Sequence, residues 1–372
     1  MKDAVEFNSK LVTHRFMGDN DIIMDAWGRQ KVVYDYSLFL SVFVYGIQDE
    51  IWKYTQNVSV LNNELIVGNN SKISSRRHMR YQPNRGQLFS TACFIPNQNG
   101  KVRYGLFNDE NGVFFEYDNG ILYGVVRTKY NSQIIEDRKE IALPEGFDIS
   151  KGNVYDIQFQ WRGVGNYRFM INLDEVLVFD YLGKLDRLSM SNPSLPISVE
   201  NISNDSNFIL KTSCFDVTSE GGKTPKLFYD NVLNPTDRVV NQTGAPILSL
   251  QMKSTFKGNI NTIDYRILKA IFTTDKKSEF SIYYTEDPTA ITGASWIDDN
   301  NSAHIVDYSA TALNISKCKR IAYRSYSSGG SFEISGFLDV LERILSAGEI
   351  LIIFAQGNSA TVRGSFDIGV EI

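Results

Sequence analysis

The sequence has little cysteine, and what it has is scattered. The only three cysteines among 372 residues are Cys93, Cys214 and Cys318. They lie far apart and form no CxxC pair, so we expect neither a disulfide framework nor a zinc knuckle. A chain of this length buries enough surface to fold without such cross-links.

Common catalytic motifs are also absent. His14, His78 and His304 share no metal-ligand spacing, and the chain contains neither a G-x-S-x-G elbow nor a phosphate-binding loop. Two acidic pairs, Asp109–Glu110 and Asp174–Glu175, fall in apparent hairpin turns, where acidic residues are favoured for backbone reasons. No tight E-x-D-x-E strand pattern occurs. We therefore predict a protein that is not an enzyme, with no catalytic residue, no metal site and no cofactor.

The charge balance and hydropathy exclude further classes. The net charge is −5 and the isoelectric point is near 5.4, whereas nucleic-acid-binding proteins are typically basic. No run of about 18 apolar residues is present, so no membrane span is expected. The first residues lack an apolar segment of the signal-peptide type, and we expect synthesis in a cytoplasm. Neither nucleic acid nor membrane is a predicted partner.

Aromatic residues are plentiful, and they alternate with polar ones. The chain has 19 Tyr and 23 Phe, residue types that favour pleated sheets. The pattern is clearest in Tyr155–Tyr181, where polar and apolar residues alternate with a period of two. Breaks at Gly163–Gly165 and Leu173–Glu175 are short enough to be hairpin turns. This stretch predicts a three-stranded antiparallel meander in which Trp161 and Phe169 are buried.

Turn signals continue along the chain every eight to twelve residues. Asn108–Asn111 and Asp118–Gly120 are two of these predicted hairpin turns. Frequent turns between short alternating strands are typical of an all-β protein built as a β-sandwich. One short helix is predicted at Val340–Ser346. The predicted divisions are an N-terminal docking arm (1–30), a β-sandwich domain (31–218), a linker (219–245) and a smaller C-terminal β domain (246–372).

Arginines cluster before one predicted strand. The cluster could tie a loop to carboxylates or carbonyls of the protein's own sheet edge, or bind a protein partner. Binding to nucleic acid is the third reading, and the acidic balance of the chain opposes it. The N-terminal arm has apolar residues but too few periodic ones to fold alone, so we expect it to dock on a partner. The predicted interface residues are Trp27, Arg29, Arg76, Arg77, Arg80 and Arg85.

Four segments together resemble a known module. Residues 25–45, 76–92, 103–128 and 157–181 are similar, in order and spacing, to a module of virion structural proteins from tailed bacteriophages and some large DNA viruses. Residues 195–203 fit the same module. The sequence departs from the family pattern at Met79, in the second segment, where the pattern has proline. The resemblance implies a concanavalin-like or jelly-roll β-sandwich. It also implies a non-enzymatic role in a virus particle, as a capsid decoration, head-fibre or tail-associated protein.

The expected partners follow from this resemblance. They are other capsid or tail proteins, and copies of the chain itself in an oligomer or symmetric array within the virion. The first alternative is a carbohydrate-binding module for host glycans, which predicts exposed aromatic residues on a concave sheet face, with Tyr117, Tyr123 or Trp161 among them. The second is a glycan depolymerase, which requires two carboxylates in a groove.

Overall fold

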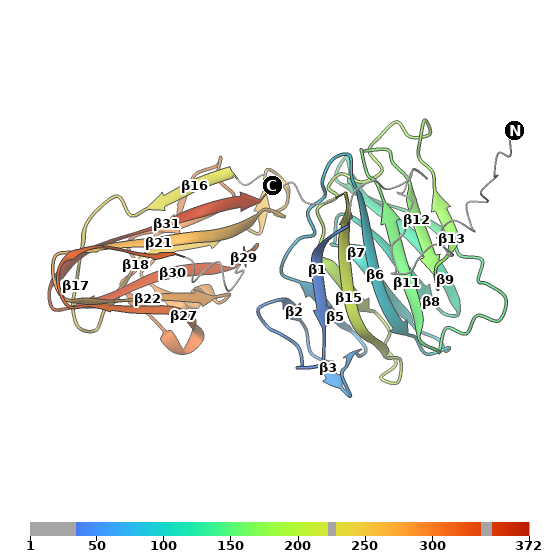
Figure 1. Cartoon of the computed structure of the whole chain (residues 1–372), viewed down its shortest axis with the longest axis horizontal. Helices are drawn as coiled ribbons and strands as arrows, with labels where there is room; N and C mark the ends of the chain where they lie inside the picture. Colours follow the sequence, from blue (N-terminus) through green and yellow to red (C-terminus); the bar gives the residue numbers. More distant parts are fainter. Residues whose placement is uncertain (1–34, 222–227, 336–343, 372) are drawn as a thin grey trace, which may run out of the picture. The chain divides into compact units, whose positions relative to one another are not determined.

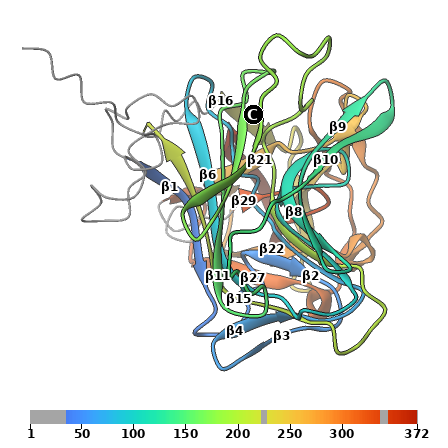
Figure 2. The same ribbon diagram turned by 90° about the vertical axis from the view of Figure 1, so that its right-hand side faces the viewer.

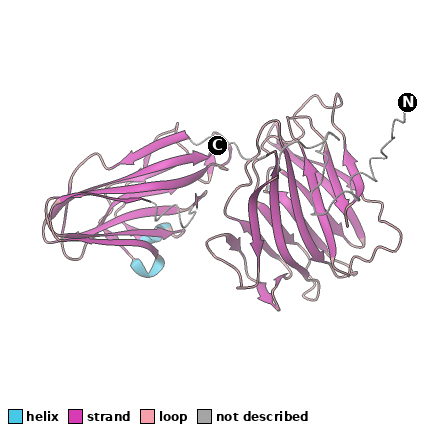
Figure 3. Ribbon diagram, in the orientation of Figure 1, coloured by secondary structure: helices cyan, strands magenta, loops and turns pink. Residues whose placement is uncertain are grey.

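The computed structural model describes residues 35–221, 228–335 and 344–371, and its elements are almost all strands (Figures 1 and 3). The chain divides at residues 225–226 into two compact units, each with its own hydrophobic core. The predicted fold class, an all-β protein with a jelly-roll-like sandwich, is confirmed. The described part of the chain has no helix long and apolar enough to span a membrane.

The first unit is a sandwich of two antiparallel sheets. Sheet 1 has the order β13-β12-β11-β6-β15-β4-β3, with β1 paired to β15, and sheet 2 has the order β10-β9-β8-β7-β14-β5-β2. Figures 1 and 2 show them as two layers, with β6 and β11 in one and β8 and β9 in the other. The strands of sheet 1 are β1 (Tyr36–Val42), β3 (Val58–Leu61), β4 (Glu64–Val67), β6 (Gly86–Phe94), β11 (Asn153–Phe159), β12 (Tyr167–Ile171), β13 (Asp174–Phe179) and β15 (Leu210–Glu220). Those of sheet 2 are β2 (Trp52–Tyr54), β5 (Ser71–Ser75), β7 (Lys101–Phe107), β8 (Gly112–Asp118), β9 (Ile121–Tyr130), β10 (Gln133–Glu140) and β14 (Ile197–Asn201).

Aromatic side chains from both sheets meet between the layers. The Phe115 ring of sheet 2 lies 5.2 Å from that of Tyr155 and 5.0 Å from that of Phe169, both in sheet 1. Phe169 is fully buried, as expected, whereas Trp161 is only half-buried. Trp161 lies just after β11, where its indole Nε1 donates to the carbonyl of Met190 at 2.8 Å. The prediction of a buried Trp161 was therefore wrong, because the strand ends before this residue.

The predicted hairpins form, with one shift in position. The turn between β8 and β9 contains Asn119 and Gly120 at φ 51° and 96°, values typical of the two-residue turns that match strand twist. The turn between β12 and β13 contains Asn172 and Leu173 at φ 50° and 74°. It therefore begins one residue earlier than expected, and Asp174 already belongs to β13.

The second unit contains two larger sheets and two small ones. Sheet 3 has the order β16-β31-β21-β28, with β17 paired to β31 and β29 to β21; sheet 4 has the order β24-β25-β18-β30-β22-β27. The strands of sheet 3 are β16 (Phe228–Leu233), β17 (Arg238–Val240), β21 (Asp264–Thr274), β28 (Gly330–Ser335), β29 (Ile344–Leu345) and β31 (Ala360–Glu371). Those of sheet 4 are β18 (Ala245–Met252), β22 (Ser278–Thr285), β24 (Ile297–Asp298), β25 (His304–Asp307), β27 (Lys319–Tyr326) and β30 (Ile350–Gly357). Two-stranded pairs join β19 (Thr255–Phe256) to β20 (Asn259–Ile260) and β23 (Ile291–Thr292) to β26 (Ala312–Leu313), and 3₁₀ turns span Pro288–Ala290 and Ile315–Lys317.

Two local expectations fail in this unit. The segment 219–245, expected to be a linker, contains β16 and β17, both of which pair with β31. The helix expected at Val340–Ser346 is replaced, in its described part, by β29, whose Leu345 is buried and lies opposite Tyr265. Residues 340–343 lie outside the described residues. In both places, pairing with a distant strand outweighs the local pattern.

Candidate functional site

The outer face of sheet 2 carries the densest set of charged groups in the described part of the first unit. Successive side chains of a strand point to opposite faces. Because Tyr104 and Phe115 point into the core, Arg103 and Glu116 point outward. We name this surface the charged face, and define it by Lys101, Arg103, Glu116, Asp118, Tyr123, Arg138 and Glu200.

Glu116 lies at the centre of the charged face, and its side chain is only 1% exposed. Its carboxylate accepts hydrogen bonds from Arg103 Nε at 2.6 Å and from Arg138 Nε at 2.8 Å, and Lys101 Nζ lies 3.3 Å away. Burial acts to raise the pKa of Glu116. The hydrogen bond from Arg103 and the charges of the three cations outweigh that effect and hold the pKa below its ordinary value.

Two of these cations also reach a second carboxylate. Lys101 Nζ lies 3.1 Å from Asp118, and Arg138 Nη2 donates to the same oxygen at 2.9 Å. Lys101 lies directly opposite Asp118 in the pairing of β7 with β8. Arg138 comes from β10 and crosses β9 to reach them, with its guanidinium carbon 3.3 Å from the centre of the Tyr123 ring. The strand register, rather than any sequence motif, therefore brings these groups together.

An apolar bed lies beneath the charged groups. Phe107, Phe114 and Val125 form a small buried cluster on this side of the sheet. The guanidinium of Arg127 lies 4.8 Å from the Phe114 ring centre and pairs with Glu136 at 2.7 Å. Guanidinium planes held on aromatic rings lose little entropy when they form hydrogen bonds.

The charges of this face are balanced. The residues that define it include three bases and three acids. Glu200 is the third acid, and it pairs with Arg103 at 3.6 Å. The face thus presents fixed hydrogen-bond donors and acceptors side by side, without excess charge of either sign. Tyr123 adds a flat ring, half-buried at the edge of the array.

Only one of the three aromatic residues expected on a sugar-binding face lies on it. Tyr117 is 1% exposed in the core and donates its hydroxyl to the Gln98 carbonyl. Trp161 is half-buried beside the core, and Tyr123 is on the charged face. Arg103 and Arg138 were not predicted as site residues. The signal for Arg103 was the alternation of charged with apolar residues in β7, taken as evidence for a strand alone, whereas the mostly polar β10 gave no such signal for Arg138.

The predicted interface arginines lie elsewhere and contact their own chain. Arg76 Nε donates to the Asp49 carbonyl at 2.6 Å. Arg77 donates to the Leu38 carbonyl at 3.1 Å, and Arg85 donates to the Gln82 side chain at 3.1 Å. Arg80 is half-buried between them. Trp27 and Arg29, with the rest of the arm 1–30, lie outside the described residues, and the interface role of all six residues stays a prediction.

The acidic residues predicted in turns form ion pairs with bases of their own sheets. Asp109 pairs with Lys72 at 3.0 Å, and Glu110 pairs with Lys129. Glu175 lies 3.5 Å from Arg168. Within the described ranges, no group of three or more His, Cys, Asp or Glu is arranged to hold a metal ion.

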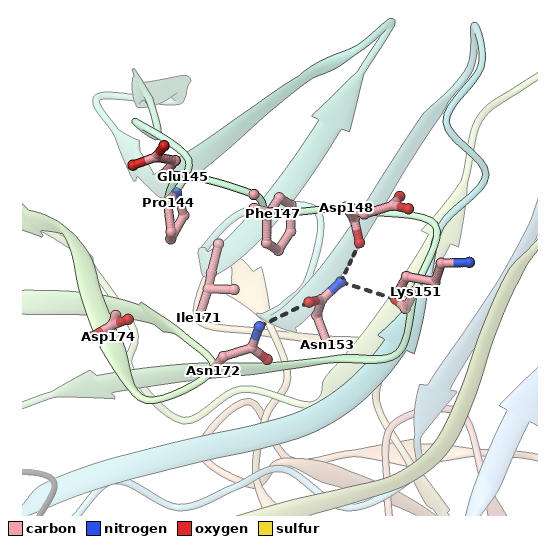
Figure 4. Close-up of a pocket in the computed structure, with 10 residues that line it drawn as sticks. Pro144, Glu145, Phe147, Asp148, Lys151, Asn153, Ile171, Asn172 and Asp174 are labelled. Carbon is pink, nitrogen blue, oxygen red and sulfur yellow. Dashed lines mark hydrogen bonds between the residues drawn. The ribbon is translucent and has the colours of Figure 1, made fainter.

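A hollow of about 270 Å³ lies at one end of the sandwich, between the loop after β10 and the β12–β13 turn (Figure 4). Its polar wall is built by two amides. Asn153 Nδ2 donates to the carbonyls of Asp148 and Lys151, and Asn172 Nδ2 donates to Asn153 Oδ1 at 2.9 Å. These amide donors are used within the wall, so their clear role is to hold the loop against the hairpin.

Comparison with known proteins gives structural likeness only. No family model matches the chain, and no curated protein matches it in sequence. Among solved structures, an endo-1,3-beta-glucanase from Streptomyces sioyaensis is similar at 11% identity with a TM-score of 0.40, covering 50% of this chain and 97% of that one. An endo-beta-1,3-glucanase from Pyrococcus furiosus (11%, 0.38, covering 51% and 96%) and beta-agarase B from Zobellia galactanivorans (9%, 0.38, covering 50% and 94%) are similar to the same degree.

These comparisons contradict the prediction that the chain is not an enzyme, because the similar structures are those of two glucanases and an agarase. That prediction is withdrawn. Identities of 9 to 11% with TM-scores of 0.38 to 0.40 assign neither a substrate nor a reaction to this chain. Its function has to be argued from its own side chains.

Proposed function

We propose that the first unit binds a neutral, hydroxyl-rich carbohydrate on the charged face. The observation that carries the proposal is the array around Glu116, in which two arginines and a lysine are fixed on two carboxylates beside the Tyr123 ring. Each sugar hydroxyl both donates and accepts a hydrogen bond. The partly exposed Asp118 carboxylate and Arg138 guanidinium, 23% and 33% exposed, supply both partners side by side, and the buried Glu116 carboxylate fixes Arg138.

Charge balance supports a neutral ligand over an acidic one. Three bases and three acids neutralise each other on the face, so a polyanion gains no net attraction and must displace existing ion pairs. The apolar face of a sugar ring can pack against Tyr123, which is already held by Arg138. Because the donors are held in place before binding, little side-chain entropy is lost.

The test uses the full chain on an array of neutral and acidic glycans, followed by calorimetric titration of the best ligand. Arg138→Ala and Tyr123→Ala are each expected to weaken binding roughly tenfold or more, the usual loss for a charge-assisted hydrogen bond or an aromatic contact. The control is Arg168→Ala, which removes an arginine paired with Glu175 on the other sheet. Equal affinity in all three variants, or a preference for acidic glycans, would contradict the proposal.

Cleavage is measured in the same samples as the release of reducing ends from the bound glycan. Glu116 and Asp118 share Lys101 and Arg138 as partners, so they are the carboxylate pair on this face to replace first. Release that Glu116→Gln abolishes while binding persists would extend the proposal from recognition to hydrolysis.

A second function, as a structural component of a virus particle, is supported by the resemblance of four sequence segments to virion proteins. Exposed apolar residues on and after the edge strand β1 also support it. Leu40 is 68% exposed and Tyr45 is 91% exposed, which suits packing against other particle proteins or copies of this chain. Mass spectrometry of purified particles should then detect the chain at a fixed copy number. Its presence only in the host lysate would contradict this function.

A further inference from the structure

A second hollow lies in the C-terminal unit, far along the chain from the charged face. Its volume is about 580 Å³, within the range of roughly 300–1,000 Å³ typical of small-molecule sites. Its lining comes from the end of β18 and the residues that follow it as far as Lys257, and from the segment that contains Asp298 and Asn300. Ile305 and Gly348 complete the lining.

An aromatic ring and two ammonium groups stand together in this hollow. Phe256 is half-buried, and its ring centre lies 5.9 Å from Lys253 Nζ and 5.2 Å from Lys257 Nζ. The two lysines differ in their partners. Lys253 pairs with Asp298 at 2.5 Å and donates to the Asp299 carbonyl at 3.1 Å. Among the described residues, Lys257 has no carboxylate partner and contacts only the ring.

The backbone at Lys257 is a second, independent observation. Lys257 has φ 48° and the following Gly258 has φ 80°, so the two residues form the tight turn of the hairpin. Asn, Asp or Gly normally occupies the first of these positions, because other side chains strain the left-handed conformation. A lysine there puts a cation without a carboxylate partner among the described residues into the lining of the hollow, at a conformational cost.

We propose that this hollow binds a uronic-acid unit of a saccharide, with its carboxylate on Lys257 and its ring on Phe256. The lining carries one positive charge in excess, since Asp298 neutralises Lys253 and nothing neutralises Lys257. An ammonium group that already sits over a ring accommodates an anion without losing a partner. The Asn300 amide and the Asp298 carboxylate also line the hollow and offer hydrogen-bond partners to sugar hydroxyls.

The proposal is independent of the carbohydrate site on the first unit. That site is expected to prefer a neutral sugar, whereas this hollow is expected to prefer an acidic one. The test titrates the full chain carrying Tyr123→Ala, which weakens the neutral-sugar site of the first unit, with a disaccharide of glucuronic acid and glucose, and separately with the matching disaccharide of two glucose units. The acidic disaccharide should bind at least roughly tenfold more tightly, and its affinity should fall as salt is raised.

One variant of the hairpin and one control variant complete the test. Lys257→Asn removes the cation and places a favoured residue in the turn, so it should abolish the preference for the acidic disaccharide without lowering the melting temperature. Lys277→Gln removes an exposed lysine from another turn of the same unit and should change nothing. The proposal is overturned if the neutral disaccharide binds equally well, if neither disaccharide binds, or if Lys257→Asn retains the preference. Acetate that binds as tightly as the acidic disaccharide would also overturn it, because the sugar ring would then contribute nothing.

Discussion

Asp156 is a carboxyl group whose burial opposes its ionisation. It is 4% exposed on the outer side of sheet 1, opposite Ser90 of β6, which in turn lies opposite Asp216 of β15. Burial raises the pKa of Asp156 from 3.8 to about 6, the hydrogen bond with Ser90 opposes this effect, and the charge of Asp216 adds to it. The folded protein therefore holds a proton here at a pH where the unfolded chain has lost it.

The pKa shift of Asp156 makes the free energy of unfolding depend on pH. A carboxyl with a raised pKa lowers the free energy of unfolding at neutral pH, and this loss is recovered as the pH falls from about 7 to about 4. Asp156→Asn should therefore raise the free energy of unfolding at pH 8 by roughly 2–3 kcal/mol, and by almost nothing at pH 4. Urea unfolding at the two pH values measures the difference.

A carboxylate with the opposite shift provides the control. Asp180 is exposed, and the hydrogen bond from Lys184 lowers its pKa. Asp180→Asn should not stabilise the protein at pH 8. Equal stability of Asp156→Asn and the unchanged protein at pH 8 would show that Asp156 pays no burial penalty.

At the scale of an element, the β12–β13 hairpin is strained by its own turn. Leu173 has φ 74° and is 46% exposed, so it occupies a left-handed conformation while its side chain contributes little packing. Leu173→Gly removes a cost of about 1–2 kcal/mol and adds about 0.5–1 kcal/mol of unfolded-state entropy. We expect a net gain in stability of about 0.5–1 kcal/mol, measured as a higher melting temperature.

An exposed leucine in an ordinary turn conformation gives the comparison. Leu182 is 44% exposed and lies outside the left-handed region. Leu182→Gly has no strain to relieve and should lower stability slightly. A loss of stability in both variants would mean that Leu173 makes contacts worth more than its strain.

At the scale of the whole molecule, the two units have separate cores. In the first, Trp52 is 1% exposed, lies 5.3 Å from Phe215 between ring centres, and donates to Ser41 Oγ at 3.1 Å. In the second, Phe272 is fully buried and stacks on Phe280 at 4.7 Å. Among the described residues, none belongs to both clusters. We therefore expect two thermal transitions rather than one.

The two core residues test this separation as a matched pair. Trp52→Ala and Phe272→Ala should each cost roughly 3–5 kcal/mol by leaving a cavity. Differential scanning calorimetry should show each variant lowering one transition and leaving the other in place. A single transition that both variants shift would mean that the units unfold together.

Much of the fold could be read from local alternation. In β11, Ile157 and Phe159 face the core while Asp156 and Gln158 face outward, as a period of two requires. The turn at residues 118–120 was predictable because Asn119 and Gly120 tolerate positive φ, and the turn at residues 108–111 because the Asn108 side chain accepts hydrogen bonds from the backbone of Glu110 and Asn111. Both signals depend only on residues close in sequence, so strands and turns can be predicted without knowing which strands pair.

The candidate sites depended on information that no local pattern contains. Arg138 reaches Glu116 across β9 only because β8, β9 and β10 pair in one register, and Glu116 becomes buried only beneath those neighbours. The sequence could not show which lysine of the hollow lacks a carboxylate partner. The structure pairs Asp298 with Lys253, and it gives Lys257 no such partner among the described residues. By itself, the amino-acid order determined the all-β class, the strands and the hairpin turns, because their energetics are set within a few residues. Tertiary structure alone decided which charges meet, which face is covered and which cation stays unpaired, because these depend on strands brought together from distant parts of the chain.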